Sequence, residues 1–320
     1  MSPSIPYRAP WWLPGRHAQT LYGVLFARAR IAWERERWDT PDGDFIDVDR
    51  LPGEPGAPLV VLFHGLEGSS ASHYALALAR ELRRRGWGGA IAHFRGCSGE
   101  PNRLPRAYHS GDSAEIRWIM RRFSAASRDA PLFAAGVSLG GNALLKWLGE
   151  DPEAKNVVAA AAAISAPVDL MAAGAALERG FNLVYTRAFL ATMRKKAEEK
   201  LGRFPGIFDG RAMRRARTLR EFDDVVTAPL HGFRDTDDYW TRASSKPLLP
   251  RIQVPTLLLN ARNDPFLPEE ALPEPSEVSP AVRLEFPGEG GHAAFVSAPF
   301  PGDIDWMPRR VTAFFEESMG

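Results

Sequence analysis

A serine between two glycines, in Gly136-Val137-Ser138-Leu139-Gly140, constrains the fold of this chain more than any other feature. It follows the apolar run from Pro131 to Ala135, which is typical of a buried strand. It precedes the stretch from Asn142 to Leu148, which is typical of a helix. Small residues let the chain turn sharply from strand to helix without a Cβ clash. The setting predicts a nucleophile elbow, in which the Ser138 hydroxyl stands above the sheet at the N-terminus of the new helix.

Strand and helix patterns alternate along most of the chain. Further apolar runs that predict parallel strands are Leu59–Phe63, Trp87–Phe94, Val157–Ser165, Val254–Asn260 and Val282–Phe286, with helices predicted at Ala71–Arg85, Asp112–Ser127, after Pro268 and near Asp303–Glu317. Ile31 to Asp39 and Phe45 to Asp49 flank a turn and predict an antiparallel hairpin. The alternation predicts an α/β protein with a doubly wound, mostly parallel sheet and an N-terminal antiparallel hairpin.

The alternation stops between Ala166 and Leu249, where the pattern is mainly helical. We therefore expect a core domain made of residues 1–165 and 250–320, and a helical lid, residues 166–249, inserted between the sixth and seventh strands. The lid is locally basic, because Arg187 to Glu221 contains 11 Lys and Arg residues against four Asp and Glu residues. This excess fits a solvated helical surface or attraction to anionic lipid or an acidic substrate headgroup.

Bulky apolar residues are interleaved with the charges of the lid. They are Phe181, Leu183, Val184, Tyr185, Phe189, Leu190, Phe204, Ile207 and Phe208. We expect most of them to bury the lid against the core and some to line an acyl pocket. Trp11 and Trp12, near the N-terminus, fit either packing across the sheet edge or contact with a bilayer interface.

Composition excludes several classes of function. The net charge of +1 over 320 residues argues against a nucleic-acid partner. No uncharged apolar window approaches the length of a membrane-spanning helix, and Met1 to Arg30 lacks the apolar core of a signal peptide. Cys97 is the only cysteine, which suits a cytoplasmic protein. The histidine spacings match no metal motif, and the glycine clusters match no nucleotide motif, so we expect no metal and no cofactor.

A serine nucleophile needs a base, and the base needs an orienting acid. Of the two histidines after Ser138, His231 lies in the predicted lid, whereas His292 follows a predicted strand in a glycine-rich loop at the carboxyl edge of the sheet. We therefore expect His292 to be the base. Asp264 lies at the end of the predicted strand Val254–Asn260 and is the expected acid. This role is compatible with an Asx turn before Pro265. The competing carboxylates Asp112, Asp237, Asp238 and Glu289 do not end that strand.

The oxyanion of an acyl-transfer reaction needs two backbone N–H donors. Leu139, directly after the serine, and Leu66, in His64-Gly65-Leu66-Glu67-Gly68-Ser69, are the expected donors. We expect His64 to shape this loop by packing and hydrogen bonding. Ser110 and Asp112 are expected helix N-caps, and Cys97 an inert thiol.

Several blocks of this sequence, taken in order, resemble a known family. They are Trp12-Leu13, Gly15-Arg16-His17-Ala18-Gln19-Thr20, His64-Gly65-Leu66-Glu67-Gly68-Ser69, Phe94-Arg95-Gly96-Cys97-Ser98-Gly99, Tyr108-His109-Ser110-Gly111-Asp112, Gly136-Val137-Ser138-Leu139-Gly140-Gly141-Asn142 and Asn263-Asp264-Pro265-Phe266. They are similar to the YheT-like branch of the α/β-hydrolases, which includes the animal abhydrolase-domain proteins one to three. The resemblance implies the α/β-hydrolase fold and a Ser138–Asp264–His292 triad that cleaves carboxylic esters.

The resemblance also bears on the substrate. Family members are associated with short- to medium-chain esters and, in animals, with phospholipids. The animal members begin with a membrane-anchoring helix that is not evident here, so a soluble, bacterial-type esterase is expected. An acyltransferase or thioesterase with the same triad, and a catalytically silent binding protein, are the alternatives. The acyl length, the alcohol group and the oligomeric state are left open.

Overall fold

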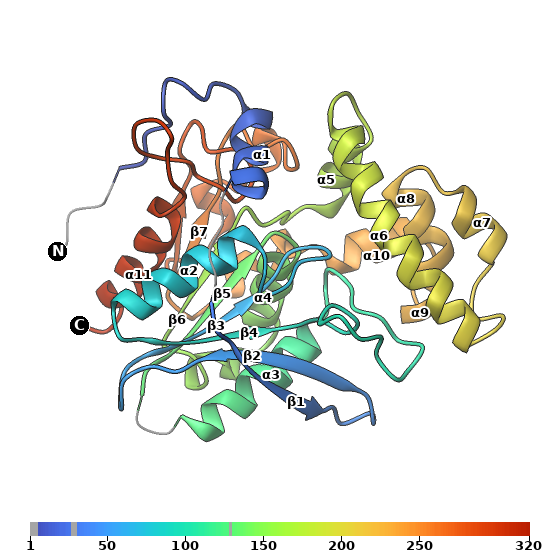
Figure 1. Ribbon diagram of the computed structural model, residues 1–320, viewed down its shortest axis with the longest axis horizontal. Coiled ribbons are helices and arrows are strands. Elements are labelled where there is room, and N and C mark those ends of the chain that lie inside the picture. Colours follow the sequence, from blue (N-terminus) through green and yellow to red (C-terminus); the bar gives the residue numbers. More distant parts are fainter. Residues whose placement is uncertain (1–5, 27–30, 128–129) are drawn as a thin grey trace.

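An eight-stranded sheet forms the centre of the molecule in a computed structural model that describes residues 6–26, 31–127 and 130–320 (Figure 1). Its strands run in the order β1-β2-β4-β3-β5-β6-β7-β8. β1 and β2 form an antiparallel hairpin, β2 is also antiparallel to β4, and all other neighbours are parallel. The strands are β1 (Glu34–Asp39), β2 (Phe45–Leu51), β3 (Leu59–Phe63), β4 (Gly88–Ala92), β5 (Leu132–Val137), β6 (Ala160–Ile164), β7 (Thr256–Leu259) and β8 (Val282–Glu285). The predicted sheet and hairpin are confirmed.

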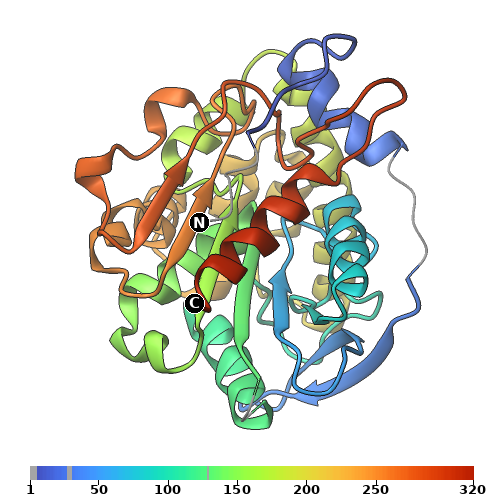
Figure 2. The ribbon, with the colours of Figure 1, turned by 90° about the vertical axis from the view of Figure 1, so that its left-hand side faces the viewer.

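Helices cover both faces of the sheet. α2 (His73–Arg84) and α11 (Trp306–Glu317) lie on one face, where α11 crosses the sheet in Figure 2, and α3 (Ser113–Ala126) and α4 (Leu139–Glu150) lie on the other. Alternate residues of β3 serve the two layers: Val60 and Leu62 pack with α2 and α11, whereas Val61 and Phe63 pack with α3 and α4. A strand buried on both faces must be apolar throughout, which is why β3 reads as an unbroken apolar run.

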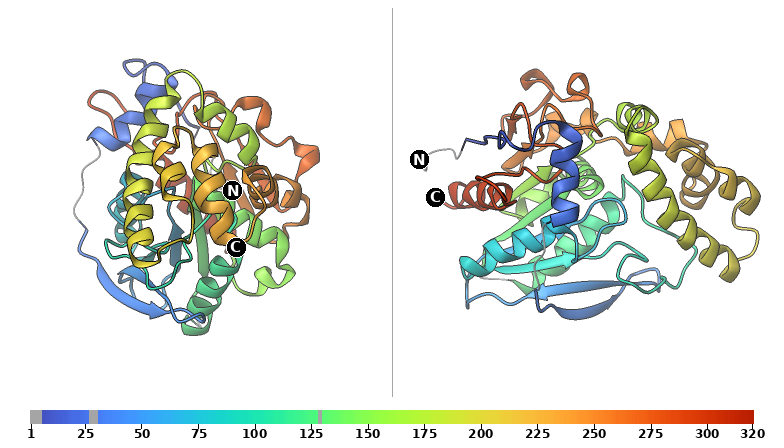
Figure 3. Two further views of the ribbon diagram at one scale, coloured as in Figure 1. Left: turned by 90° about the vertical axis from the view of Figure 1, so that its right-hand side faces the viewer. Right: turned by 45° about the horizontal axis from the view of Figure 1, so that its top comes forward.

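The segment between β6 and β7 contains helices in place of strands. It holds α5 (Leu170–Leu177), α6 (Asn182–Arg203), α7 (Gly210–Arg215), α8 (Leu219–Phe222), a π-helical turn (Asp223–Thr227), α9 (Ala228–His231), α10 (Thr236–Ala243) and a 3-10 turn (Lys246–Arg251). These helices gather at one end of the molecule, beyond the carboxyl ends of the parallel strands (Figures 1 and 3). They have an apolar cluster of their own, built around Leu190, Met213 and Trp240.

Smaller elements complete the chain. α1 (Arg16–Phe26), which the sequence analysis did not predict, lies beside the C-terminal loop that precedes α11 (Figure 1). The helix predicted after Pro268 is a single 3-10 turn (Glu269–Ala271). A second 3-10 turn (Pro275–Glu277) follows it, and another (Pro152–Asn156) leads into β6. None of the helices in the ranges described has the combination of length and apolar character needed to cross a bilayer.

Candidate active site

Ser138 occupies the turn between β5 and α4. Its φ of 53° and ψ of −122° form a conformation that side chains rarely adopt and that is typical of strained functional turns. The Ser138 N–H donates to the Ile164 carbonyl at 2.9 Å, which ties the turn to β6. A Cβ on Gly140 would lie 2.4 Å from the Phe63 carbonyl oxygen, so only glycine permits this approach of α4 to β3. The sharp turn leaves Ser138 at the wall of a cavity.

Asp264 and His292 lie together at the carboxyl edge of the sheet, after β7 and β8. His292 Nδ1 is 2.9 Å from Asp264 Oδ2 and 3.1 Å from Oδ1. Because a carboxylate only accepts hydrogen bonds, this contact places the proton on Nδ1 and leaves Nε2 as an acceptor. Asp264 Oδ1 also accepts from the Phe266 N–H at 2.8 Å, so the carboxylate makes the Asx turn as well.

The structure brings Ser138 to the same region but does not join it to the pair. Over the described residues, no hydrogen bond links the Ser138 hydroxyl to the His292 ring. Phe266 contacts both the cavity and His292. Its side chain lines the cavity beside Ser138, and the centre of its ring is 4.1 Å from the centre of the His292 ring. Serine–histidine contacts are commonly long without substrate and shorten when it binds.

Leu66 and Leu139 present free backbone N–H groups beside the same cavity. Both line it, and among the described hydrogen bonds neither N–H has an acceptor. In the Leu66 loop, the N–H groups on either side are already bonded. The Gly65 N–H donates to the Tyr74 hydroxyl and the Glu67 N–H to the Tyr108 hydroxyl, each at 2.9 Å, which leaves the Leu66 N–H free among the described residues. Leu139 begins α4, where the first N–H groups have no intrahelical partner. Two such donors are what a developing oxyanion requires.

His64 shapes the loop that carries Leu66, as expected. Its ring is fully buried, with Nδ1 2.8 Å from the Gly65 carbonyl and Nε2 accepting from the Phe94 N–H at 3.1 Å. Burial lowers the pKa of His64 to about 3, so the ring is neutral and both of its nitrogens are used. This histidine therefore fixes the loop that carries Leu66.

The cavity beside Ser138 has a volume of about 530 Å³ and is mostly walled by the helices between β6 and β7. Its apolar lining includes Leu177, Phe189, Met193, Phe222, Val226 and Trp240. Among the residues expected to line an acyl pocket, Phe189 does so. Phe181 and Leu183 do not line it: Phe181 is 48% exposed and its ring lies 4.5 Å from that of His17. Phe181 directly precedes α6 and packs beside His17, whereas Phe189 lies within α6 and faces the cavity.

Three basic residues of α6 bind the core. Lys196 Nζ lies 2.9 Å from Glu67 Oε2, Lys200 Nζ donates to Asn102 Oδ1 at 3.0 Å, and Arg203 Nη1 donates to the Asn102 carbonyl at 2.6 Å. Burial lowers the pKa of Lys200 to about 8. Lys196 and Lys200 are half-buried, whereas Arg203 is exposed. Lys196 ties α6 to Glu67, and Lys200 and Arg203 dock it onto the loop around Asn102.

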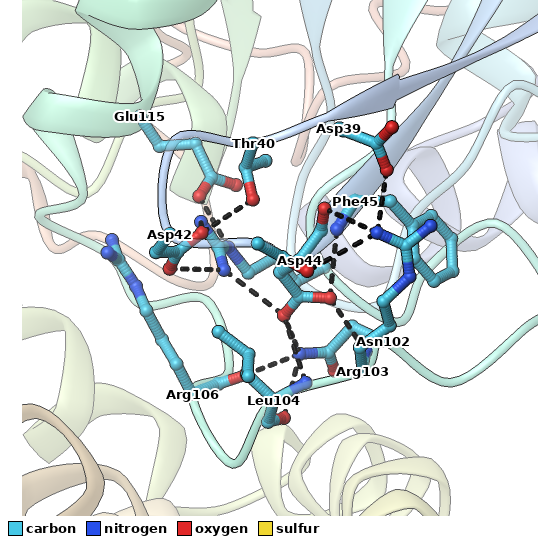
Figure 4. A network of polar contacts seen from close by, with 12 residues as sticks. Asp39, Thr40, Asp42, Asp44, Phe45, Asn102, Arg103, Leu104, Arg106 and Glu115 are labelled. Atoms are coloured by element: carbon cyan, nitrogen blue, oxygen red, sulfur yellow. Dashed lines mark hydrogen bonds and ion pairs between the residues drawn. The ribbon is translucent and has the colours of Figure 1, made fainter.

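That loop is anchored in turn by a buried polar network at the hairpin turn (Figure 4). Asp44 accepts from Asn102 Nδ2 and from the Arg103 N–H, both at 2.6 Å. Arg95 Nε donates to Glu115 at 2.6 Å, and its Nη1 lies 3.1 Å from Asp44. Burial alone would raise the pKa of Asp44, but the hydrogen bonds that its carboxylate accepts hold the pKa below its ordinary value. The N-terminal hairpin thereby supports one wall of the cavity.

Two expected caps do not form. Asp112 precedes α3 but its side chain makes no capping hydrogen bond, because the carboxylate pairs with Arg106 at 2.7 Å. Ser110 precedes the N-cap position of α3 by two residues, and its N–H donates to the Tyr239 hydroxyl. Cys97 is buried, and burial raises the pKa of its thiol to about 11, as suits an unreactive cysteine.

The remaining candidates are engaged elsewhere. Asp237 pairs with Arg220 and Asp238 with Arg242, whereas the His231 ring packs 4.5 Å from that of His109. Trp12 packs against Tyr22 of α1 and against Phe300 of the C-terminal loop, rather than across the sheet edge. Trp11 is 90% exposed. Within the described ranges, no group of three or more His, Cys, Asp or Glu side chains is arranged to hold a metal ion.

The sequence analysis missed the side chains that hold the His292 loop. Ser165, at the end of β6, accepts from the Ala293 N–H at 3.0 Å, and Thr20 of α1 accepts from the His292 N–H at 2.9 Å. Thr20 and its neighbour Gln19 stand in the Gly15–Thr20 motif. That motif was the available signal, but neither periodicity nor spacing connects it to His292.

Comparison with known proteins agrees with this architecture. The model of the alpha/beta hydrolase fold family matches residues 58–299. The protein YheT of Escherichia coli K12, provisionally named an esterase, is 38% identical over 92% of this chain and 88% of its own length. Phospholipase ABHD3 of mouse is 29% identical over 97% of this chain and 78% of its own. The Pyrococcus furiosus esterase Pf2001 shares the fold, with a TM-score of 0.57 at 17% identity over 98% of this chain and 97% of its own.

Proposed function

Because this chain belongs to the α/β-hydrolase family, whose model and relatives cover most of it, we propose that it is a serine carboxylic-ester hydrolase with the triad Ser138, Asp264 and His292. The observation that carries the proposal is the Asp264–His292 contact of 2.9 Å, made at the edge of the sheet where β5 delivers Ser138. The names of the relatives, esterase and phospholipase, support cleavage of an ester bond.

The proposed reaction proceeds through an acyl-enzyme. Ser138 Oγ attacks the ester carbonyl while His292 Nε2 takes its proton, and Asp264 stabilises the imidazolium through Nδ1–H. The N–H groups of Leu66 and Leu139 stabilise the oxyanion of the tetrahedral intermediate. His292 then returns the proton to the departing alcohol, and a water molecule repeats the sequence to release the acid. The acyl group moves first to Ser138 and then to water.

The substrate we propose is a small acyl ester of short to medium chain length. A largely apolar cavity of about 530 Å³ beside Ser138 supports it, since each methylene buried there adds about 0.8 kcal/mol until the cavity is full. Residues 166–249 would act as the lid that sets this limit. A cytoplasmic location, suggested by the single cysteine, and peripheral lipid contact through the lid or Trp11-Trp12 stay expectations of this proposal.

The chain-length preference provides a direct test of the cavity. We expect p-nitrophenyl esters with acyl chains of about 4–10 carbons to be hydrolysed fastest in a panel from acetate to palmitate, given the energy per methylene. Phe189→Ala enlarges the wall and should move the optimum to longer chains. Phe181→Ala is the matched control, because Phe181 directly precedes α6 and its side chain lies outside the cavity. Identical profiles for both variants and the unsubstituted protein would remove Phe189 from the acyl pocket.

A further inference from the structure

The N-terminal motif from Gly15 to Thr20 contacts the loop that carries His292, although the two are far apart in the sequence. Most of the motif lies in the first turn of α1, and Figures 1 and 3 show α1 beside the C-terminal loop. Gln19 is fully buried and Thr20 is 5% exposed. Buried polar side chains need hydrogen-bond partners, and each of these two has one on that loop.

Thr20 binds the backbone of His292 itself. Its hydroxyl donates to the Arg16 carbonyl at 2.7 Å and accepts from the His292 N–H at 2.9 Å. Because the hydroxyl proton is used by Arg16, a lone pair is directed at His292. The approach requires glycine at the preceding position, since a Cβ on Gly291 would lie 2.8 Å from Thr20 Oγ1.

Gln19 connects the segments that carry the two members of the pair. Its Oε1 accepts from the Gly290 N–H at 3.1 Å and from Asn263 Nδ2 at 3.0 Å. Asn263 Oδ1 in turn accepts from the Gly291 N–H at 3.0 Å. Asn263 directly precedes Asp264, and the two glycines directly precede His292. One buried amide therefore links the Asn263 side chain, next to the acid, to the Gly290 backbone, in the loop that carries the base.

We propose that Gln19 and Thr20 are positioning residues, which set the orientation of His292 toward Asp264 and Ser138. The proposal rests on the proposed function. Gly290 and Gly291, at φ of 147° and 62°, give the loop little stiffness of its own, so its conformation depends on these external hydrogen bonds. Small displacements of a catalytic group cost about 100-fold in rate, which makes such anchoring consequential.

The test compares three single substitutions on α1 in the full chain. Thr20→Val keeps the side-chain shape but removes both hydrogen bonds, and we expect kcat to fall about 10- to 100-fold at nearly constant KM. Thr20→Ser keeps the hydroxyl and should restore kcat to within a few-fold. Tyr22→Phe, the matched control, removes the hydrogen bonds to the Pro301 and Gly302 carbonyls, further along the same loop, and should leave kcat unchanged.

Asn263→Ala provides a second variant, at a partly exposed position, in case Thr20→Val does not fold. It removes the hydrogen bonds to Gln19 and Gly291, and we expect a similar loss of kcat and of the rate of fluorophosphonate labelling. A lowered melting temperature with unchanged kcat in both variants would overturn the proposal and leave a structural role. Failure of the unsubstituted protein to be labelled at Ser138 would instead reject the proposed function.

Discussion

Replacing Ser138 with alanine should lower kcat for ester hydrolysis by about 10⁶-fold, the largest effect expected of any single substitution. The reason is chemical, since alanine has no oxygen to form the acyl-enzyme. The fold should persist, because the Ser138 backbone, rather than its hydroxyl, holds the turn through the Ile164 carbonyl. Turnover of p-nitrophenyl butyrate and the melting temperature are the measurements.

Ser110→Ala is the control for that experiment, because Ser110 lines the same cavity and has no proposed role in the chemistry. We expect its activity to stay within a few-fold of the unsubstituted protein. Retention of more than about one-hundredth of the activity in Ser138→Ala would eliminate Ser138 as the nucleophile, since the loss expected for a nucleophile is far larger.

The second large effect concerns Asp264. Asp264→Asn should lower kcat on the order of 10⁴-fold, because an amide can donate to Nδ1 and thereby favours the tautomer with the proton on Nε2. His292 could then no longer accept the serine proton. The Asx turn can survive, as the amide oxygen still accepts from the Phe266 N–H. Kinetics with p-nitrophenyl butyrate, together with a melting curve, separate this chemical loss from unfolding.

Asp238→Asn and Asp112→Asn are the comparisons for Asp264→Asn. Asp238 pairs with Arg242 at the surface, and Asp112 pairs with Arg106 at a distance of 2.7 Å. Neither carboxylate contacts His292, so neither substitution should reproduce the loss of turnover. An active Asp264→Asn protein beside an inactive Asp112 or Asp238 variant would transfer the acid role to that other carboxylate.

The parts of the fold that were predictable from the sequence are those with a local signal. β3 and β5 are unbroken apolar runs because helices cover both of their faces. The elbow could be located because the approach of α4 to β3 tolerates no Cβ at Gly140. The positions of Asp264 and His292 relative to Ser138 followed from the order of the strands, since parallel strands deliver their carboxyl ends to one edge.

What could not be predicted depends on contacts between distant segments. α1 has few apolar residues facing the core, and its buried face is made largely of Gln19 and Thr20, whose partners lie about 270 residues away. Asp112 was expected to cap α3, but Arg106 competes for its carboxylate. Phe181 and Phe189 have the same chemistry in the sequence. Their different places, beside His17 and in the cavity, are decided by how α6 packs.

The central claim is that Ser138 is the nucleophile of an active site, and a labelling experiment tests it most directly. The full chain is treated with a small fluorophosphonate, digested, and analysed by mass spectrometry. We expect one adduct, on the peptide that contains Ser138, with labelling abolished by Ser138→Ala and strongly slowed by Asp264→Asn. Absence of the adduct from the folded protein, or an adduct on a different residue that persists in Ser138→Ala, would contradict the claim.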